Sequence, residues 1–410
     1  MRPTVPTSRS QRPRPWSESG RGVRHRQTEA RHTATRAHAL GERRVASVAL
    51  PPVTRVPVRD DLRALEGYHS PQVDVRVRLN TNESPVEPPA AWRDAFAAEM
   101  SRVEWHRYPD RAATALRAGI AEVHGVAPEQ VFAANGSNEV LQTILLTFAG
   151  PGRTVCTFEP TYQLHAHIAR LTGVRVSETD RSPDFTLDLP AALAAIEREQ
   201  PSVTFLCSPN NPTGLVEPPA NVRAVLQAVT SLPTPGLLVV DEAYAQFAGW
   251  SALELLDEDT PVVVSRTFSK TWSMAGTRLG YVIGPRWFVS ELDKVILPYH
   301  LDAAKQIAGR LALRFVGEME ERVQMIVAER ERIVRALDAL PVDQVPSGAN
   351  FVLFRPRGVP GRKVWQGLLD RSVLVRDCSS WPRLDDCLRV TVGTPDENDA
   401  FLAALQEVLP

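Results

Sequence analysis

The sequence predicts an α/β fold: a large, mainly parallel sheet sandwiched by helices, followed by a smaller α/β unit at the carboxyl end. Short apolar, β-branched runs alternate with helical patterns between residues 131 and 283. This alternation is typical of a parallel sheet with helices on both faces. After a long helical stretch the alternation of strands and helices resumes over a shorter segment. The chain has 410 residues, 43% of them hydrophobic, which is enough for two or three domains.

The elements of the larger unit follow from hydrophobic period and length. An alternating segment (Val73, Val75, Val77, Leu79) comes first, and helices are expected at 89–102, at 112–123 and after a turn at 135–139. The sheet strands are expected at 154–158, 174–177, 203–207, 237–240, 262–264 and 281–283, with helices at 189–199 and 219–229.

The smaller unit begins with the strongly helical stretch 303–340. A run of mixed charges over 318–332 is interpreted as a solvated helix face with i,i+4 pairs. The remaining elements are expected as strand 351–355, helix 362–371, strands 373–376 and 388–392, and helix 398–408. We therefore predict an amino-terminal segment at 58–105 that packs with the small domain, a large domain at 106–300 and a small domain at 301–410.

Residues 1–57 form a leader rich in Arg, Pro, Ser and Thr without a sustained apolar period. Such a composition predicts disorder. The first 50 residues carry a net charge of +8, so the rest of the chain is acidic at −9. An Arg-rich, acid-poor leader resembles a transit peptide, and its charge suits contact with nucleic acid. The simplest interpretation is an extension without a function of its own.

The composition of the chain limits the cellular locations and the classes of partner that we expect for the protein. No stretch approaches the roughly 18 consecutive apolar residues of a membrane span. The four cysteines, Cys156, Cys207, Cys378 and Cys387, are widely spaced, and no secretory signal is evident. Reduced thiols in the cytoplasm are the simplest account. We expect no metal site, no nucleic-acid partner and no membrane partner.

The stretch 267–281 carries the first chemical signal. Lys270 lies between the hydroxyls of Ser269 and Thr271, and Arg278 follows before an apolar strand. A second cation disfavours the ammonium form of a lysine, which suits a nucleophile that attacks a carbonyl. Hydroxyls and a guanidinium suit a phosphate dianion. The implied ligand is a phosphorylated carbonyl compound, and pyridoxal 5′-phosphate fits that description.

The small-residue turn 135–139 opens a helix and is a second phosphate-suited element, because free backbone N–H groups attract anions. Polar residues also follow three predicted strands, at 159–162, 208–214 and 241–244. Ligands of parallel sheets bind at these carboxyl ends. Asp241 directly follows an apolar strand, where a carboxylate needs a cationic partner. A pyridinium nitrogen is such a partner.

Taken together, these motifs resemble the fold-type I pyridoxal-phosphate-dependent aminotransferases of class I and II. Within that family, the similarity is to the histidinol-phosphate aminotransferases of actinobacterial type. The resemblance covers about residues 60–410. Its motifs are, in order, 79–85, 107–110, 135–139, 160–162, 208–214, 241–244, 268–281, 298–301, 347–351 and 388–393.

The resemblance implies roles for individual residues around the cofactor. Lys270 would bind its aldehyde covalently and then move protons, while Asp241 would keep the ring nitrogen protonated. Tyr162 would stack on the ring, and Asn211 and Tyr244 would bind its phenolic oxygen. The cofactor-binding set is Lys270, Gly136, Ser137, Asn138, Tyr162, Asn211, Asp241, Tyr244, Thr267, Ser269 and Arg278, of which Lys270, Asp241 and Tyr244 are catalytic.

The resemblance also implies the substrate contacts. Arg376 and Arg389 would bind the substrate phosphate or the α-carboxylate of glutamate, because a guanidinium accepts both anions. Tyr68 and Asn82 are candidates on the amino-terminal side, and Tyr108 would reach the site across a homodimer interface.

The implied reaction converts L-histidinol phosphate and 2-oxoglutarate into imidazole-acetol phosphate and L-glutamate in histidine biosynthesis. An aromatic amino-acid aminotransferase on the same scaffold is the alternative. More remote are a decarboxylase of the phosphothreonine type, a transcriptional regulator with an aminotransferase-like domain, and an inactive homologue. Ser84 departs from the family pattern near the substrate, whereas Asn138 and Thr277 are departures that leave the cofactor chemistry untouched.

Overall fold

The structure is a computed structural model that describes residues 56–63, 65, 67 and 73–410. All but the last two residues of the predicted leader 1–57 lie outside the described residues, and so does Tyr68. Residues 58–410 form one compact unit.

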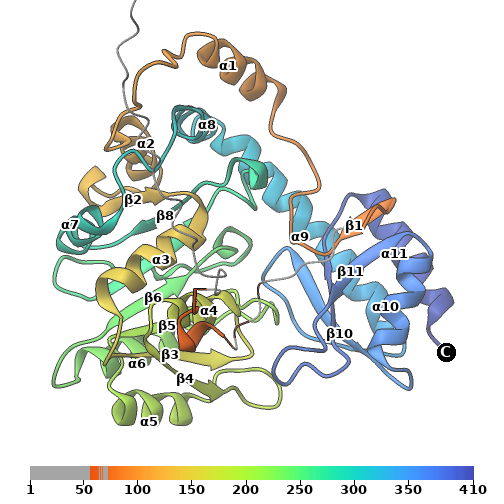
Figure 1. Cartoon of the computed structure of the whole chain (residues 1–410). Coiled ribbons are helices and arrows are strands. Elements are labelled where there is room, and N and C mark those ends of the chain that lie inside the picture. Colours follow the sequence, from red (N-terminus) through yellow and green to blue (C-terminus); the bar gives the residue numbers. More distant parts are fainter. Residues whose placement is uncertain (1–55, 64, 66, 68–72) are drawn as a thin grey trace, which may run out of the picture. The chain divides into compact units, whose positions relative to one another are not determined.

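The larger of two sheets has seven strands in the order β2-β8-β7-β6-β5-β3-β4 (Figure 1). Its strands are β2 (Val131–Ala134), β3 (Thr154–Glu159), β4 (Arg175–Asp180), β5 (Val203–Cys207), β6 (Leu237–Asp241), β7 (Val262–Thr267) and β8 (Gly280–Ile283). Five strands that are neighbours in the order β4, β3, β5, β6 and β7 run parallel to one another. Strand β8 runs antiparallel to both β7 and β2. The sheet is therefore mainly parallel, as predicted.

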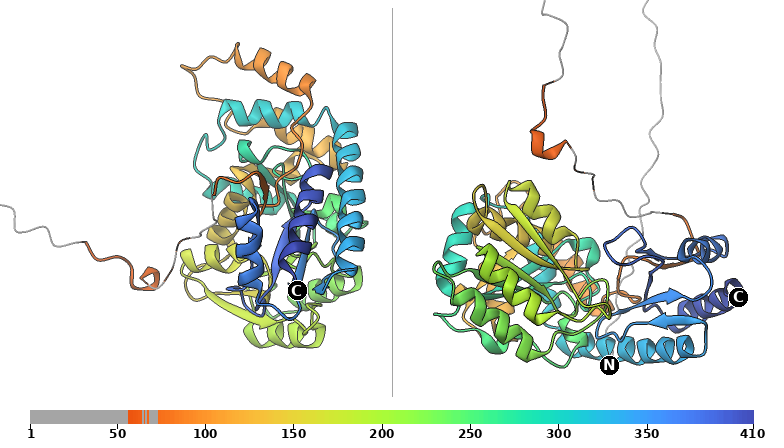
Figure 2. Two further views of the ribbon diagram at one scale, coloured as in Figure 1. Left: turned by 90° about the vertical axis from the view of Figure 1, so that its right-hand side faces the viewer. Right: turned by 90° about the horizontal axis from the view of Figure 1, so that it is seen from below.

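Helices cover both faces of this sheet, as the views in Figure 2 show. The helices are α2 (Thr114–His124), α3 (Gly136–Phe148), α4 (Leu164–Leu171), α5 (Leu189–Glu199), α6 (Pro219–Thr230), α7 (Arg286–Val295) and α8 (Ala303–Ala312). Successive strand residues point to opposite faces. Thus Phe132 packs with the core beneath α3, α4 and α7, whereas Val131 and Ala133 pack with the core beneath α2 and α8.

The smaller sheet has five strands in the order β1-β11-β12-β10-β9. They are β1 (Val77–Leu79), β9 (Val342–Gln344), β10 (Phe351–Pro356), β11 (Val373–Asp377) and β12 (Leu388–Thr391). Three helices lie beside it in Figure 1, namely α9 (Val316–Asp338), α10 (Gly361–Asp370) and α11 (Pro395–Val408). Strand β1, from the amino-terminal side, pairs in parallel with β11.

Helix α1 (Ala90–Met100) packs against α8, and its Trp92 Nε1 donates a hydrogen bond to the Ala308 carbonyl at 3.1 Å. Short 3₁₀ helices complete the described chain at Asp60–Leu62, Pro128–Gln130, Ala245–Phe247, Ala252–Leu255 and Ala275–Thr277. No helix of the described residues combines the length and the apolar character needed to cross a membrane.

The structure corrects several local predictions. The stretch 303–340 forms two helices, α8 and α9, which residues 313–315 separate. Helix α11 begins at Pro395, where Thr394 and Glu397 form a capping box. Helices α4 and α7 and strands β2 and β9 were not predicted. The solvated-face interpretation of 318–332 is wrong for Arg322 and Arg330, which are only 8% and 7% exposed.

Candidate functional site

A cavity of about 340 Å³ lies at the carboxyl ends of the parallel strands β5, β6 and β7. Segments from both sheets line it, including residues 80–83 after β1 and Arg389 of β12. This is the edge where ligands of parallel sheets bind. The predicted site residues in its lining are Asn82, Ser137, Asn138, Tyr162, Asn211, Asp241, Tyr244, Thr267, Ser269, Lys270, Arg278 and Arg389.

Lys270 lies in the loop that follows β7, three residues after the end of that strand, and its Nζ donates a hydrogen bond to the Thr81 carbonyl at 3.1 Å. The same nitrogen lies 5.7 Å from the centre of the Tyr244 ring. Burial lowers the pKa of Lys270 to about 7, with Arg389 and then Arg278 adding to the effect and Glu83 opposing it. The lysine is therefore largely an uncharged amine slightly above neutral pH. The sequence argument identified Arg278 but not the larger contributions of burial and Arg389.

Asp241 ends β6 and is 2% exposed. Its Oδ2 lies 2.9 Å from Nε2 of His165, and its Oδ1 accepts a hydrogen bond from the Ala243 amide at 3.2 Å. The His165 ring is fully buried and stacks on Phe205 with ring centres 4.6 Å apart. His165 is thus a site residue that the sequence analysis missed. Its position three residues after Tyr162, at the start of α4, was the available signal.

The start of α3, where the sequence predicts an anion cradle, lies beside Ser269 and Arg278. Gly136 has a φ of +79°, and a Cβ there would lie 2.9 Å from Arg278 Nη2. Gly280 lets β8 pass close to the same helix start, since a Cβ on it would lie 2.2 Å from the Ser137 nitrogen. Arg278 Nη1 is 3.4 Å from Ser269 Oγ. The helix start, the hydroxyl and the guanidinium therefore converge, which suits a dianion.

Tyr162 and Tyr244 are both hydrogen-bonded to amide side chains. The Tyr162 hydroxyl donates to Asn138 Oδ1 at 3.2 Å, and Asn82 Nδ2 donates to the Tyr244 hydroxyl at 2.9 Å. Burial raises the pKa of Tyr244, so its hydroxyl stays protonated at neutral pH. It remains a hydrogen-bond donor at the cavity wall.

Arg389 links the small sheet to the cavity. Its Nη1 donates to Asn211 Oδ1 and its Nη2 to the Asn80 carbonyl at 3.0 Å, while its Nε has no partner. The guanidinium lies 5.1 Å from the centre of the Phe351 ring and is 5% exposed. A buried guanidinium whose contacts are neutral groups is suited to an anionic ligand.

Arg376 lies directly opposite Arg389 in the β11–β12 pair and is 7% exposed. Its guanidinium is 5.5 Å from the centre of the Trp381 ring, and Trp381 lines the cavity. Arg376 itself lies behind the lining. Tyr108 is 80% exposed, stacks on Tyr299 with ring centres 4.4 Å apart and is not part of the cavity.

The segment after β1 is held by both sheets. The Asn82 amide donates to Thr391 Oγ1 at 3.0 Å, and Asn350 Nδ2 donates to the Asn82 carbonyl at 3.2 Å. Further along, Ser273 Oγ donates to Ser84 Oγ at 2.7 Å. The polar cluster expected after the first strand therefore closes the cavity over Lys270.

Comparison with known proteins places this geometry in a family. The family model "Aminotransferase class I and II" matches residues 75–405. The chain is 47% identical to the histidinol-phosphate aminotransferase of Frankia casuarinae over 365 residues, which is 86% of this chain and 90% of that protein. It is 46% identical to the histidinol-phosphate aminotransferase of Streptomyces avermitilis over 364 residues, covering 86% of this chain and 96% of that protein.

Solved structures show the same fold. The histidinol-phosphate aminotransferase of Sinorhizobium meliloti in complex with pyridoxal-5′-phosphate superimposes with a TM-score of 0.74. It shares 27% identity and covers 82% of this chain and 91% of that chain. Aspartate aminotransferase of Thermus thermophilus with maleate has a TM-score of 0.72 at 24% identity, covers 82% of this chain and 92% of that chain, and is similar in fold. On the family match, which spans nearly all of the described chain, this protein belongs to the class I and II aminotransferases.

Proposed function

We propose that this chain transfers the amino group of L-histidinol phosphate to 2-oxoglutarate, giving imidazole-acetol phosphate and L-glutamate in histidine biosynthesis. The observation that carries this proposal is the 47% identity to a histidinol-phosphate aminotransferase over 86% of the chain. The cavity adds physical support, because it places a lysine of lowered pKa near a buried guanidinium.

The cofactor of this aminotransferase is pyridoxal 5′-phosphate, and the residues present fit it. The α3 start, Ser269 and Arg278 match a phosphate, and the absence of a Cβ at Gly280 lets β8 pack directly against the backbone of that helix start. Asp241 is a buried carboxylate that matches a ring nitrogen, and Lys270 matches an aldehyde. When bound, the cofactor supplies an electron sink for the bond-breaking step at the substrate Cα.

We propose that the protein positions this group through few contacts. The amides of Ser137 and Asn138, with Ser269 and Arg278, hold the phosphate. Asp241 holds a proton at the ring nitrogen, and His165 orients the Asp241 carboxylate from the side opposite its backbone contact. Asn211 and Tyr244 reach the ring oxygen, and Tyr162 covers one ring face.

Lys270 acts as the base in this proposal. Its amine would take the proton from the substrate Cα as a base and hold it as an ammonium group that can act as an acid, for which a pKa of about 7 is well matched. Enclosure by the segment after β1 keeps bulk water from the amine. General acid and base catalysis of this kind typically contributes about 10² to 10⁴ in rate.

Arg389 and Arg376 form the proposed anion site for the two substrates. Their opposed positions on β11 and β12 place two guanidinium groups on adjacent strands. Arg389 lines the cavity, and Arg376 lies on the adjacent strand beside Trp381, which also lines the cavity. One pair of fork-shaped donors accepts either a phosphate or a carboxylate.

We further propose that the protein is a cytoplasmic homodimer. The aromatic pair of Tyr108 and Tyr299 is exposed in the single chain. A second copy placed over it would cover these rings and bring Tyr108 to the partner's cavity. The domain limits 58–105, 106–300 and 301–410 likewise stay a prediction.

A screen of amino donors tests the substrate assignment. The purified, cofactor-loaded chain is mixed with histidinol phosphate, phenylalanine, tyrosine or aspartate, and the cofactor absorbance is followed in single turnovers. We expect histidinol phosphate to react at least about 10² times faster than phenylalanine, because its phosphate dianion binds the two guanidinium groups more strongly than the single α-carboxylate of phenylalanine does. Lys270→Ala is the blank. Faster turnover of phenylalanine would replace this assignment with an aromatic amino-acid aminotransferase.

A further inference from the structure

Arg322 is a buried cation in the middle of α9, within the stretch that the sequence pattern suggested to be solvated. It is 8% exposed, its Nη1 donates to the Thr271 carbonyl at 2.7 Å, and its Nε has no partner. Burial lowers its pKa, and Glu318 opposes that effect. Burying a guanidinium against a carbonyl is costly, so its position calls for a function.

The partner of Arg322 is informative because Thr271 directly follows Lys270. Within the loop, Ser273 N donates to the Lys270 carbonyl at 3.2 Å and Met274 N to the Phe268 carbonyl at 3.2 Å, and the side chains of Lys270 and Ser273 bind the segment after β1. The Thr271 hydroxyl and Trp272 Nε1 are buried without hydrogen-bond partners. Arg322 is therefore the side chain that fixes the backbone immediately after the reactive lysine.

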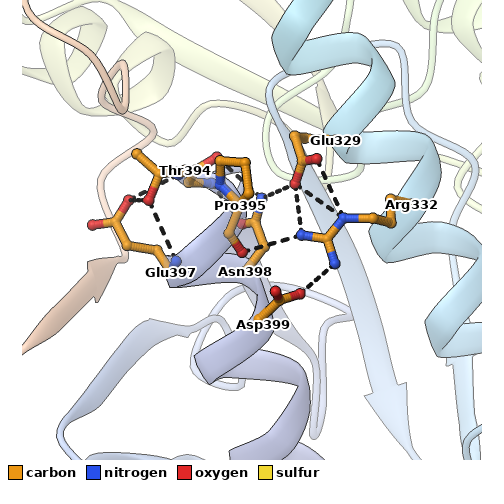
Figure 3. A network of polar contacts seen from close by, with 8 residues as sticks. Glu329, Arg332, Thr394, Pro395, Glu397, Asn398 and Asp399 are labelled. Carbon is orange, nitrogen blue, oxygen red and sulfur yellow. Dashed lines mark hydrogen bonds and ion pairs between the residues drawn. The ribbon is translucent and has the colours of Figure 1, made fainter.

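The other half of α9 is fixed to the small sheet. Arg330 Nη1 donates to the Ala349 carbonyl at 3.1 Å, next to Asn350, which holds Asn82. Two residues further, Arg332 pairs with Glu329 and Asp399, and Glu329 accepts from Asn398 Nδ2 at 2.7 Å (Figure 3). Arg322 and Arg330 are separated by roughly 12 Å of helix at the usual rise. One rigid helix thus holds the Lys270 loop at one point and the small sheet at others.

We propose that Arg322 is a positioning residue for Lys270. By holding the Thr271 carbonyl from a helix anchored on the small sheet, it fixes where the Lys270 amine lies and how closely that amine is enclosed. The proposal rests on the proposed role of Lys270 as the reactive amine, and it is independent of which amino donor is used. Because α9 also binds the sheet that carries Arg389, the distance between the Lys270 amine and the Arg389 guanidinium stays constant in this proposal.

The lysine content of the chain allows a direct measurement. The sequence has four lysines, Lys270, Lys294, Lys305 and Lys363. In full-length, cofactor-free protein labelled with ¹³C at the lysine Cε, four resonances are titrated with pH, and Lys270→Ala assigns the one of interest. We expect a pKa of about 7 for Lys270 in the wild-type chain.

Arg322→Met should admit water to the loop and raise the Lys270 pKa by about one unit or more toward its ordinary value. In the cofactor-loaded enzyme, the same variant should lower kcat about tenfold while KM changes less than about twofold, since a displaced catalytic group costs rate. Arg322→Lys keeps a cation and a donor, so its Lys270 pKa and kcat should lie between those of wild type and Arg322→Met.

Arg332→Met is the matched control, because it removes an arginine and its ion pairs from the same helix without a contact to the Lys270 loop. It should lower the unfolding free energy while leaving the Lys270 pKa and kcat as in wild type. The proposal is overturned if Arg322→Met leaves the Lys270 resonance unshifted, or if Arg332→Met shifts it equally. If Arg322→Met does not fold, Arg322→Lys takes its place. The proposal is then overturned if Arg322→Lys leaves the Lys270 resonance unshifted, or if Arg332→Met shifts that resonance equally. Failure of the histidinol-phosphate assignment would leave these titrations unchanged.

Discussion

Nε2 of His165 lies 2.9 Å from Oδ2 of Asp241, and both side chains are removed from solvent. The imidazole is held flat against Phe205 with an interplanar angle of 4°. Asp241 is therefore oriented by a ring that cannot rotate, in addition to a backbone amide. A carboxylate held in this way is ready to face a cationic ring nitrogen without reorganisation.

The contact between His165 and Asp241 predicts that replacing Asp241 lowers kcat more than replacing His165 does. Asp241→Asn keeps the shape but loses the charge, so kcat should fall by at least about 10². His165→Phe keeps the stacking on Phe205 and removes one hydrogen bond, so kcat should fall by at most about tenfold. Steady-state kinetics and the cofactor absorbance spectrum measure both variants. An equal loss in the two variants would show that the carboxylate depends on His165 for more than orientation.

The pKa of Lys270 predicts how cofactor capture depends on pH. Its pKa is lowered to about 7, so the amine is charged below that pH and neutral above it. The rate at which cofactor-free protein captures pyridoxal phosphate should rise as pH increases through about 7 and then level off. Arg389 is the largest charge that lowers this pKa, so Arg389→Met should move the midpoint upward by about half a unit or more. Stopped-flow absorbance measures the rates. A midpoint that moves downward would contradict the assigned direction.

The close approach at Gly280 predicts a loss of cofactor affinity on adding one methyl group. In Gly280→Ala the new Cβ would lie 2.2 Å from the Ser137 nitrogen and 2.5 Å from the Gly136 carbonyl carbon, so β8 and the α3 start must separate. The dissociation constant for the cofactor should rise by about 10². Gly249→Ala is the control, because apart from its chain neighbours no atom of the described residues lies within 4 Å of a Cβ built there. Titration of cofactor absorbance measures both.

The lowered pKa of His124 predicts that the folded state loses stability in acid. Its Nε2 lies 2.8 Å from the Tyr281 hydroxyl, and burial, with Arg266 adding to it, lowers its pKa to about 4. The folded state therefore keeps the imidazole neutral while the unfolded chain binds a proton below about 6.5. The free energy of unfolding should fall as pH drops from about 6.5 to about 4.

Replacing His124 removes this linkage. In His124→Asn, the part of the pH dependence between those values should disappear, as measured by urea denaturation at several pH values. His106→Asn is the control, because His106 is exposed. A pH profile that is the same in wild type and His124→Asn would mean that another group is responsible.

Most of the fold was predictable because its elements carry clear local patterns. The strand at Val203–Cys207 and the helix at Leu189–Glu199 have the predicted bounds. The polar residues after β5 and β6 could be placed together, because parallel strands bring their carboxyl ends to one edge. The single-chain structure leaves the predicted position of Tyr108 at a partner's site a prediction.

The remaining features depend on distant partners that no local pattern reveals. Arg389 lowers the pKa of Lys270 from a strand of the other sheet. Arg322 shares its charge pattern with exposed neighbours on α9, and only the packing of that helix against the Lys270 loop buries it. His165 lies three residues after Tyr162, but that spacing alone does not show that its ring reaches Asp241. In each case the side chain takes its role from tertiary packing.

Strand β1 has a consequence for biosynthesis of the protein. Val77 pairs with Val373, and the Asn80 carbonyl accepts its hydrogen bond from Arg389, so the first strand finds its partners only when the last strands have left the ribosome. The large sheet, by contrast, contains only strands that are made earlier. The proposed active-site cavity is thus completed in the final moments of synthesis, and a nascent chain with a finished large sheet still lacks the arginines of the proposed anion site.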